Sequence, residues 1–448
     1  MTTKLIRLIT GLLLFLVTGP DAFSQRGEIQ YFRYYDQRGI NIFEPAKTDT
    51  LVYDGLKLRI GANFTQGFQS IAHKNSGIVP LYELSAGFPL AMANLNIDVQ
   101  VVEGVRVSLV TYMASHHHNE MWVKGGYFQI DKVSFLKSGL LDQIWKNLTL
   151  KVGHMEINYG DAHFRRSDGG NTFWNPFIEN NIIDEFTTEI GAELYWQRKG
   201  IITMIGATNG EIQGSVTRPA DQSPSIYGKL GYDRSLTEKI RVRLTASLLT
   251  KSSSINGTLF GGDRTGSNYQ FVLEPAGATV AGNAFSGRLN PGFKDDVTAV
   301  MINPFVKVGG LELFATLEYA QGSTSVENGE IQFNDSTPLI AKQPKRKFIQ
   351  ESVDVLYRFG SREQVFIGGK WNHVNAELAF WDQSSPLAVR NVNTVSIDRL
   401  SFGAGWFITR NILVKGEYVT QKYSGYPAGN ILEDGMFSGV IMQGTIAF

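Results

Sequence analysis

The chain of 448 residues contains no cysteine and only 14 prolines. Without cysteine there is no disulfide framework, and no acylated cysteine to make the chain a lipoprotein. Charged residues make up 19% and the formal net charge is zero, so nothing indicates a nucleic-acid partner. After residue 24 no apolar run approaches the roughly 20 residues of a membrane-spanning helix, which excludes a multi-helix membrane protein.

The start of the chain has the pattern of an export signal. Lys4 and Arg7 precede an apolar run over 8–17, and Ala22 and Ser24 place small residues where a signal peptidase recognises them. We therefore predict a signal peptide over 1–24, cleaved after Ser24. An N-terminal periplasmic segment over 25–54 would follow, too short for the plug domain of a gated transporter, and a barrel would occupy 55–448.

Alternation of apolar and polar residues is the main structural signal. It is regular over 56–65, 188–196, 240–248 and 311–319, where the charged residues are separated by apolar ones and share one parity. Successive side chains of a strand point to opposite faces, whereas helical periodicity would scatter these charges around a cylinder. We expect Leu244, Leu313 and Ile446 to face lipid, and the inner face, with Arg243, Glu312 and Thr445, to face water.

The spacing of such segments predicts the architecture. About sixteen segments alternate in this way: 55–69, 88–101, 104–114, 121–131, 147–158, 187–198, 199–208, 225–233, 239–250, 296–308, 310–320, 350–359, 364–373, 398–407, 411–421 and 436–448. The gaps between them are short and long in turn, as in bacterial barrels with short periplasmic turns and long external loops. The gap 132–146 departs from this rule and predicts a small amphipathic helix. The fold class is therefore all-β, a single transmembrane antiparallel β-barrel, and the aromatic final strand ending at Phe448 agrees with it.

A barrel of this size encloses water, because sixteen to eighteen strands leave an aqueous channel. The candidate pore-lining residues are the charged members of the inner face and of the loop 160–186: Arg59, Arg106, Arg165, Arg166, Glu189, Arg241, Arg243, Glu312, Arg358 and Lys415. Arg241 and Arg243 share one face of a strand, so together they would raise the local anion concentration. The alternative is a mixed lumen, in which carboxylates on facing strands cancel them.

Several short motifs resemble a known family. The run 150–160, followed by Trp174-Asn175-Pro176, resembles the region before the third external loop of phosphate-selective-type porins, the O and P porin family. The strand 413–419 is similar to that family's penultimate strand. The stretches 261–264 and 36–40 resemble porin-like proteins of Bacteroidetes. The resemblance implies sixteen strands, a homotrimer, and external loops 160–186 and 251–295 that fold inward and constrict the lumen. For 160–186, a position over the barrel mouth is the alternative.

We expect an outer-membrane porin, a passive channel for small polar solutes with a weak preference for anions. A barrel that anchors or belongs to a larger secretion or uptake assembly is the alternative, and an outer-membrane barrel enzyme is a further one. His154, His163 and His373 lie in no catalytic motif, so we expect no enzyme. We expect no cofactor, and no metal at His116–His118, because consecutive loop residues diverge. The expected partners are membrane lipid, lipopolysaccharide near the basic cluster 342–347, and polar or anionic solutes.

Overall fold

A computed structural model describes residues 28–113, 122–168, 170–212, 223–254, 256–261, 270–280, 282–283, 286–324, 332–334, 337–339, 345–381 and 390–448. The predicted signal peptide over 1–24, the histidines at 116–118, Lys342 and most of the 261–264 motif lie outside these residues.

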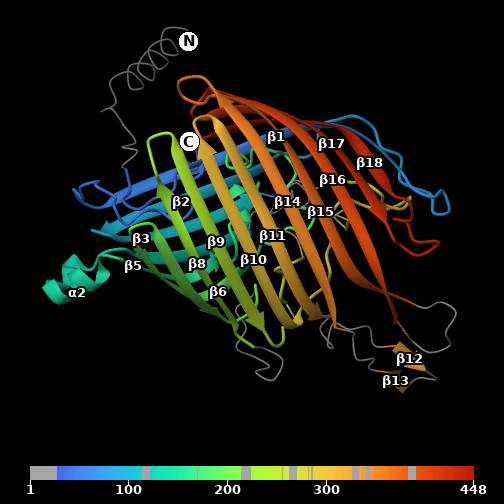
Figure 1. Cartoon of the computed structure of the whole chain (residues 1–448), viewed down its shortest axis with the longest axis horizontal. Helices are drawn as coiled ribbons and strands as arrows, with labels where there is room; N and C mark the ends of the chain where they lie inside the picture. The colour runs from blue at the N-terminus through green and yellow to red at the C-terminus, as the bar shows by residue number, and fades with distance from the viewer. Residues whose placement is uncertain are drawn as a thin grey trace, which may run out of the picture.

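Sixteen strands form a closed antiparallel barrel, which confirms the predicted fold class (Figure 1). Each predicted segment corresponds to one of them: β1 (Lys57–Lys74), β2 (Met92–Val102), β3 (Val105–Met113), β4 (Trp122–Ile130), β5 (Leu148–Glu156), β6 (Thr188–Arg198), β7 (Ile201–Thr208), β8 (Ser225–Ser235), β9 (Ile240–Lys251), β10 (Asp295–Val308), β11 (Leu311–Ser323), β14 (Arg346–Phe359), β15 (Val365–Trp381), β16 (Arg390–Thr409), β17 (Ile412–Ser424) and β18 (Met436–Ala447). The barrel closes where β1 pairs with β18, for example Thr65 with Thr445. A separate hairpin, β12 (Gln332–Asn334) with β13 (Thr337–Leu339), lies in the connection between β11 and β14.

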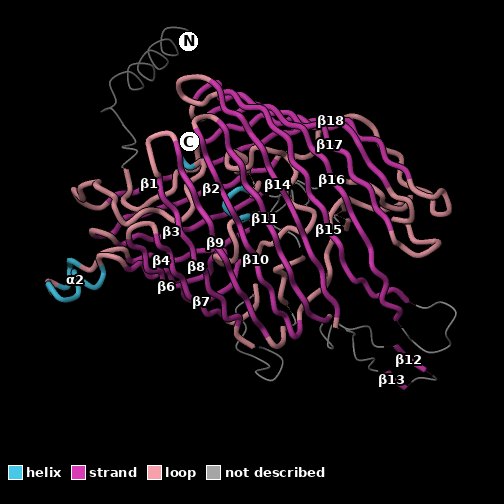
Figure 2. The backbone as a smooth tube through the Cα atoms, in the orientation of Figure 1, coloured by secondary structure: helices cyan, strands magenta, loops and turns pink. Residues whose placement is uncertain are grey.

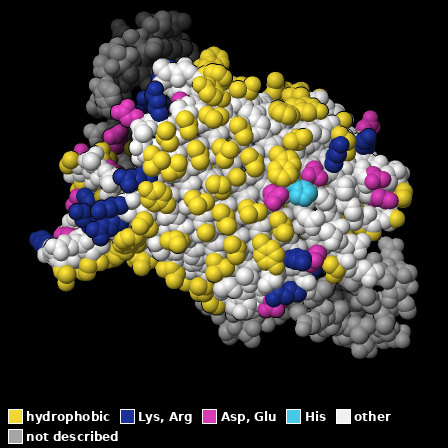
Figure 3. Space-filling view, in the orientation of Figure 1, with side chains coloured by type: hydrophobic (Ala, Val, Ile, Leu, Met, Phe, Trp, Pro, Cys, Tyr) yellow, Lys and Arg dark blue, Asp and Glu magenta, His cyan; other side chains and the backbone are white. Residues whose placement is uncertain are grey.

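The two faces of the barrel wall differ as the alternation predicts. Leu244 is 55% exposed on the outside, whereas its neighbour Arg243 is 2% exposed on the inside. Leu313 and Glu312 form the same contrast on β11. Hydrophobic side chains cover the middle of the outer surface in Figure 3, flanked by charged ones. The exposed apolar belt is the surface that a membrane barrel presents to lipid. The inner side chains Arg243, Glu312 and Thr445 are buried, not exposed to water, because other parts of the chain occupy the barrel.

Connections at the two ends of the barrel differ in length. Short turns join β6 to β7 and β16 to β17, whereas the loops at the opposite end are long (Figure 1). The 3-10 helix η2 (Ser134–Leu136) and the helix α2 (Gly139–Trp145) lie between β4 and β5, where a small helix is predicted. In the described part of the chain no helix is both long and apolar enough to cross a membrane.

Two long loops turn back into the barrel, as Figure 2 shows for the segments between its walls. The loop 160–186, which begins with the 3-10 helix η3 (Ala162–Arg165), contributes Ile178, Ile182 and Ile183 to a buried apolar cluster. The loop between β9 and β10 contributes Leu259 and Phe260. Their backbones meet, since Phe186 donates its N–H to the carbonyl oxygen of Leu259 at 3.1 Å. The inner wall of the long strands completes the cluster.

Part of the segment 28–54, which includes the 3-10 helix η1 (Gln37–Gly39), reaches into the barrel: Ile29, Tyr31 and Phe43 are buried, whereas Val52 is exposed. Phe43 packs among the inward-facing Phe305 and Phe314. The side chain of Asn41 donates a hydrogen bond of 2.6 Å to Glu312. The alternation in the strands predicts an inner face rich in polar groups. The N-terminal segment supplies hydrogen-bond partners for several of these polar groups.

Candidate functional site

The wall holds the loop 160–186 by its backbone. Lys415 Nζ donates to the carbonyl oxygens of Thr172, Asn175 and Phe177 at 2.9, 2.9 and 2.7 Å. Glu417, on the same strand, accepts the N–H of Glu179 at 3.1 Å. A buried loop must satisfy its peptide groups, and here charged wall side chains do so. Lys415, a predicted pore-lining residue, is therefore a loop anchor.

Glycine is required where this loop leaves β5. Gly160 has φ +68°, in the left-handed region, and a Cβ at this position would collide with the side chain of Met301. An L side chain would be both strained and obstructed there. The turn directs the next residue, Asp161, toward β8 and β9.

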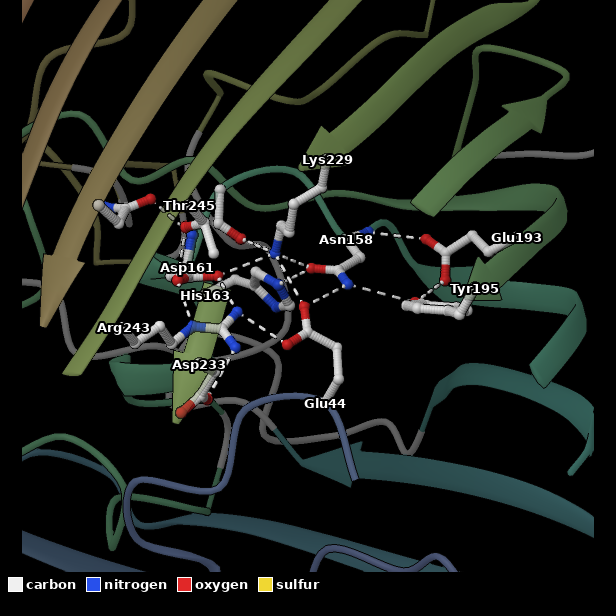
Figure 4. A network of polar contacts seen from close by, with 12 residues as sticks. Glu44, Asn158, Asp161, His163, Glu193, Tyr195, Lys229, Asp233, Arg243 and Thr245 are labelled. Carbon is white, nitrogen blue, oxygen red and sulfur yellow. Dashed lines mark hydrogen bonds and ion pairs between the residues drawn. The ribbon is translucent and has the colours of Figure 1, made fainter. Parts of the chain in front are cut away.

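Asp161 is the centre of a buried ionic network (Figure 4). It lies 2.9 Å from Lys229 and 2.7 Å from Arg243, and it accepts a hydrogen bond of 2.7 Å from Thr245. Glu44, from the N-terminal segment, lies 2.7 Å from Arg243 and 3.2 Å from Lys229. The network therefore joins the N-terminal segment, the loop 160–186 and the barrel wall.

The acids of this network are strongly stabilised in their charged form. Burial raises the pKa of Glu44, but Arg243 and Lys229 outweigh it and lower the value to about 2. The same two cations hold the pKa of Asp161 well below its usual range against the effect of burial. Both carboxylates are therefore ionised at neutral pH.

Arg241 and Arg243 do not stand free in the lumen. Arg241 lies 2.7 Å from Asp233, and Arg243 contacts Asp161, Glu44 and Asp233. With Lys229, three cations face three carboxylates. The expectation that this arginine pair sets an anion preference is therefore wrong in its physical basis, because the charge is balanced locally. This part of the interior fits the alternative of a mixed lumen: Asp233 lies on the facing strand β8, whereas Asp161 and Glu44 come from the inserted segments.

The other predicted residues are also paired. Glu312 binds Arg358 at 2.8 Å and lies 3.6 Å from Arg165. Arg166 binds Asp184 at 2.6 Å. Arg59 lies 3.6 Å from Asp98 and donates to the carbonyl oxygen of Phe448 at 3.1 Å. Glu189 accepts a hydrogen bond from Thr208. These contacts make them structural links inside the barrel, and none of them borders the cavity described next.

A cavity of about 210 Å³ lies beside the strands β2 to β6. The N-terminal segment and the loop 160–186 form its other side, through residues such as Phe32, Arg33, Phe164 and Trp174. A volume of roughly 10–15 Å³ accommodates one water, so this space holds on the order of ten or more. Of the ten predicted pore-lining residues, only Arg106 borders it.

Cations outnumber acids around this cavity. Four basic side chains, Arg33, Arg106, Lys124 and Lys151, border it together with three carboxylates, Glu44, Glu156 and Asp168. Glu44 is already bound by Arg243 and Lys229. The side chain of Arg106 donates to the neutral Gln129 at 2.6 Å, and that of Arg33 donates to the backbone oxygens of Gly39 and Phe164. Lys124 is ion-paired with Asp168, and Lys151 lies 3.7 Å from Glu193. The excess of positive charge at the cavity therefore comes from Arg33 and Arg106, whose hydrogen bonds go to neutral acceptors.

His163 stands between the cavity and the ionic network. Its Nδ1 lies 3.2 Å from Glu156, and its Nε2 is 2.9 Å from Asn158 Oδ1. Burial lowers the pKa of His163 despite the opposing effect of Glu156. His373, in contrast, faces outward between the buried Asn372 and Val374 of β15, 2.8 Å from Asp398. Among the described residues, no group of three or more His, Asp or Glu side chains is arranged to hold a metal ion.

Sequence reasoning missed most of the cavity. Lys151 stands between Leu150 and Val152 in a predicted strand, so alternation predicts its inward direction. Lys124 lies at a register shift of β4, where strict alternation would place it on the face of the exposed Trp122 and Phe128. Arg33 and the rings of Phe32 and Tyr35 lie in the N-terminal segment, which has no strand periodicity. Only the folded chain brings them to the wall.

The closed, lipid-facing barrel with inward loops has the fold of outer-membrane porins. It is similar to the anion-selective porin from Comamonas acidovorans, with 10% sequence identity, a TM-score of 0.52, and coverage of 88% of this chain and 100% of that one. It is also similar to the outer membrane channel DcaP of Acinetobacter baumannii, with 10% identity, a TM-score of 0.51, and coverage of 89% and 99%. No protein-family model and no curated protein matches the sequence.

Proposed function

We propose that the protein is an outer-membrane porin that lets small polar solutes diffuse passively and weakly prefers anions. The observation that carries this proposal is the cavity of about 210 Å³ inside the lipid-facing barrel. It is bordered by more cations than carboxylates. Fixed positive charge in a narrow, low-dielectric passage raises the local concentration of anions. The proposal concerns a channel and not an enzyme.

Membership of the O and P porin family and assembly as a homotrimer are part of the same proposal. They rest on the motifs 150–160 and 413–419. Chemical cross-linking of the purified protein, followed by mass measurement, tests the trimer. A monomer at all protein concentrations would contradict it.

The decisive experiment is a recording in a planar lipid bilayer with a salt gradient. The purified wild-type chain should conduct, and its reversal potential should indicate a modest preference for anions. That preference should weaken as salt rises, because the Debye length falls from roughly 10 Å at 0.1 M to about 3 Å at 1 M. A cation-selective wild type would contradict the assignment of the cavity charges.

A second function keeps one specific observation in its favour. Loop 160–186, the loop after β9 and residues 28–54 occupy much of the interior, as in a barrel that anchors a larger assembly. An anchor need not conduct. If the chain conducts no ions alone but is isolated with a stable partner, the anchor replaces the porin.

A further inference from the structure

The cavity beside β2 to β6 contains buried donors that lack an acceptor. Arg106 is 6% exposed and its Nε has no hydrogen-bond partner, although its other nitrogens are bonded. Asn171, in the loop 160–186, is 1% exposed and its Nδ2 has no partner either. One acceptor, Asn96 Oδ1, is also unsatisfied. Buried donors normally find a partner, so two of them at one cavity indicate a ligand with acceptor oxygens.

The positive charge of Arg106 further narrows the class of ligand. Arg106 has no carboxylate among its hydrogen-bond partners, and the nearby Lys151 lies 3.7 Å from Glu193. A neutral acceptor would satisfy the orphan donors but would place no negative charge in contact with Arg106, on which Asp98 and Asp131 act only from a distance. A carboxylate supplies two acceptor oxygens and the negative charge together, with the planar geometry that a guanidinium matches.

Aromatic rings form the other part of the lining. Phe32, Tyr35, Tyr127, Phe164 and Trp174 all border the cavity and are only partly buried. Tyr35 stacks on Trp174 with ring centroids 5.8 Å apart, and Arg33 lies 3.6 Å from the Trp174 ring centre. A small inorganic anion would contact these rings without gaining from them. A planar ring on the ligand could pack against their open surface, since aromatic pairs are favourable beyond the area they bury.

We propose that this cavity binds a small carboxylate that carries an aromatic ring. The carboxylate binds at Arg106 and Asn171, and the ring packs among Phe32, Tyr127 and Trp174. The volume suffices, because a cavity of about 150 Å³ is known to hold benzene and this one measures about 210 Å³. This inference rests on the proposed channel function only for the route by which the ligand enters. It gives the porin a solute class.

The test is calorimetric titration of the full mature protein in detergent with three probes. Benzoate carries both features, acetate only the charge, and benzyl alcohol only the ring. Benzoate should bind at least tenfold more tightly than either. Acetate binding as tightly as benzoate would overturn the role of the rings, and benzyl alcohol doing so would overturn the role of the charge.

Variants locate the site. Arg106→Gln should weaken benzoate binding about tenfold, the usual effect of losing one charge-assisted hydrogen bond, whereas Arg106→Lys should weaken it less. Arg234→Gln removes an exposed arginine from the outer surface of β8 and should change nothing. Unchanged affinity in Arg106→Gln overturns the site. If that variant does not fold, Phe32→Leu provides the second test, since it should weaken benzoate and leave acetate unaffected.

Bilayer recording separates this inference from the proposed function. Benzoate should reduce the wild-type current in a saturable way that acetate does not reproduce. A protein that conducts but does not bind benzoate overturns the inference and leaves the porin intact. One that binds benzoate but does not conduct overturns the porin and leaves the binding site.

Discussion

Glu44 connects the N-terminal segment to the barrel interior, and its charge can be removed with almost no change of shape by Glu44→Gln. In the wild type its carboxylate lies 2.7 Å from Arg243 and 3.2 Å from Lys229, and it is buried. Those cations bring its pKa from the ordinary 4.5 to about 2. Such a fall in pKa corresponds to a stabilisation of about 3 kcal/mol for the ionised form. Glu44→Gln should lose about that amount of unfolding free energy at pH 7.

The sign of the pH dependence follows from the same shift. Since the folded pKa is below the unfolded one, the stabilisation is complete above about pH 4.5 and is lost as pH falls toward 2. By pH 3, about 2 kcal/mol of it should be gone. The difference in stability between wild type and Glu44→Gln should therefore shrink between pH 6 and pH 3, because the carboxyl group becomes protonated in the unfolded chain while it stays largely ionised in the folded one.

Urea unfolding in lipid vesicles, followed by tryptophan fluorescence, measures this difference at each pH. Glu238→Gln is the matched control, since Glu238 is exposed in the turn between β8 and β9. A gap between wild type and Glu44→Gln that stays constant from pH 6 to pH 3 would refute the reasoning. So would a loss at pH 7 no larger than that of Glu238→Gln.

Three further predictions concern the wall and the loop. Lys415→Met leaves three buried carbonyls of the loop 160–186 without a donor. We expect the free energy of unfolding to fall by about 3 kcal/mol and tryptic cleavage after Arg165 to become faster. Cleavage as slow as in the wild type would contradict the role of Lys415 as an anchor. Arg106→Gln should shift the reversal potential toward cations in 0.1 M salt. Arg241→Gln should shift it much less, because the charge of Arg241 is balanced by Asp233. Equal shifts would contradict this pairing. Leu313→Arg places a charge on the lipid face and should cost about 2–4 kcal/mol in vesicle unfolding, while an unaffected midpoint would mean that this face does not meet lipid.

The strands could be predicted because alternation is a local property. A period of two over ten residues fixes which side chains share a face, so Leu244 and Arg243 were assigned to opposite sides without any knowledge of the fold. The rule failed at the loop ends of long strands. β16 runs over Arg390–Thr409, yet only 398–407 was recognised, because Val395 and Ile397 are apolar on the inner face. They pack in the buried apolar cluster that includes residues of the inward-folded loops. The local sequence of β16 does not predict that these loops pack against it.

The partners of the inner charges could not be predicted for a different reason. Arg243 meets Asp161, 82 residues away, and Lys229 meets Glu44, 185 residues away. Neither acid lies in a strand, so no register relates them to the wall.

A filled barrel changes which charges can act on a solute. Each loop or terminal segment that enters the lumen brings backbone groups and acids that must be satisfied, and the wall side chains do this first. Lys415 is used by the loop 160–186 and Arg243 by Asp161 and Glu44. The residues that remain for a solute are those whose donors the inserted segments leave open, with Arg106 the clearest case. A count of the inward-facing arginines therefore overestimates the positive electrostatic field that a solute meets inside the barrel. We therefore expect the residues that act on a solute on the side of the barrel formed by β2 to β6, and not on β9.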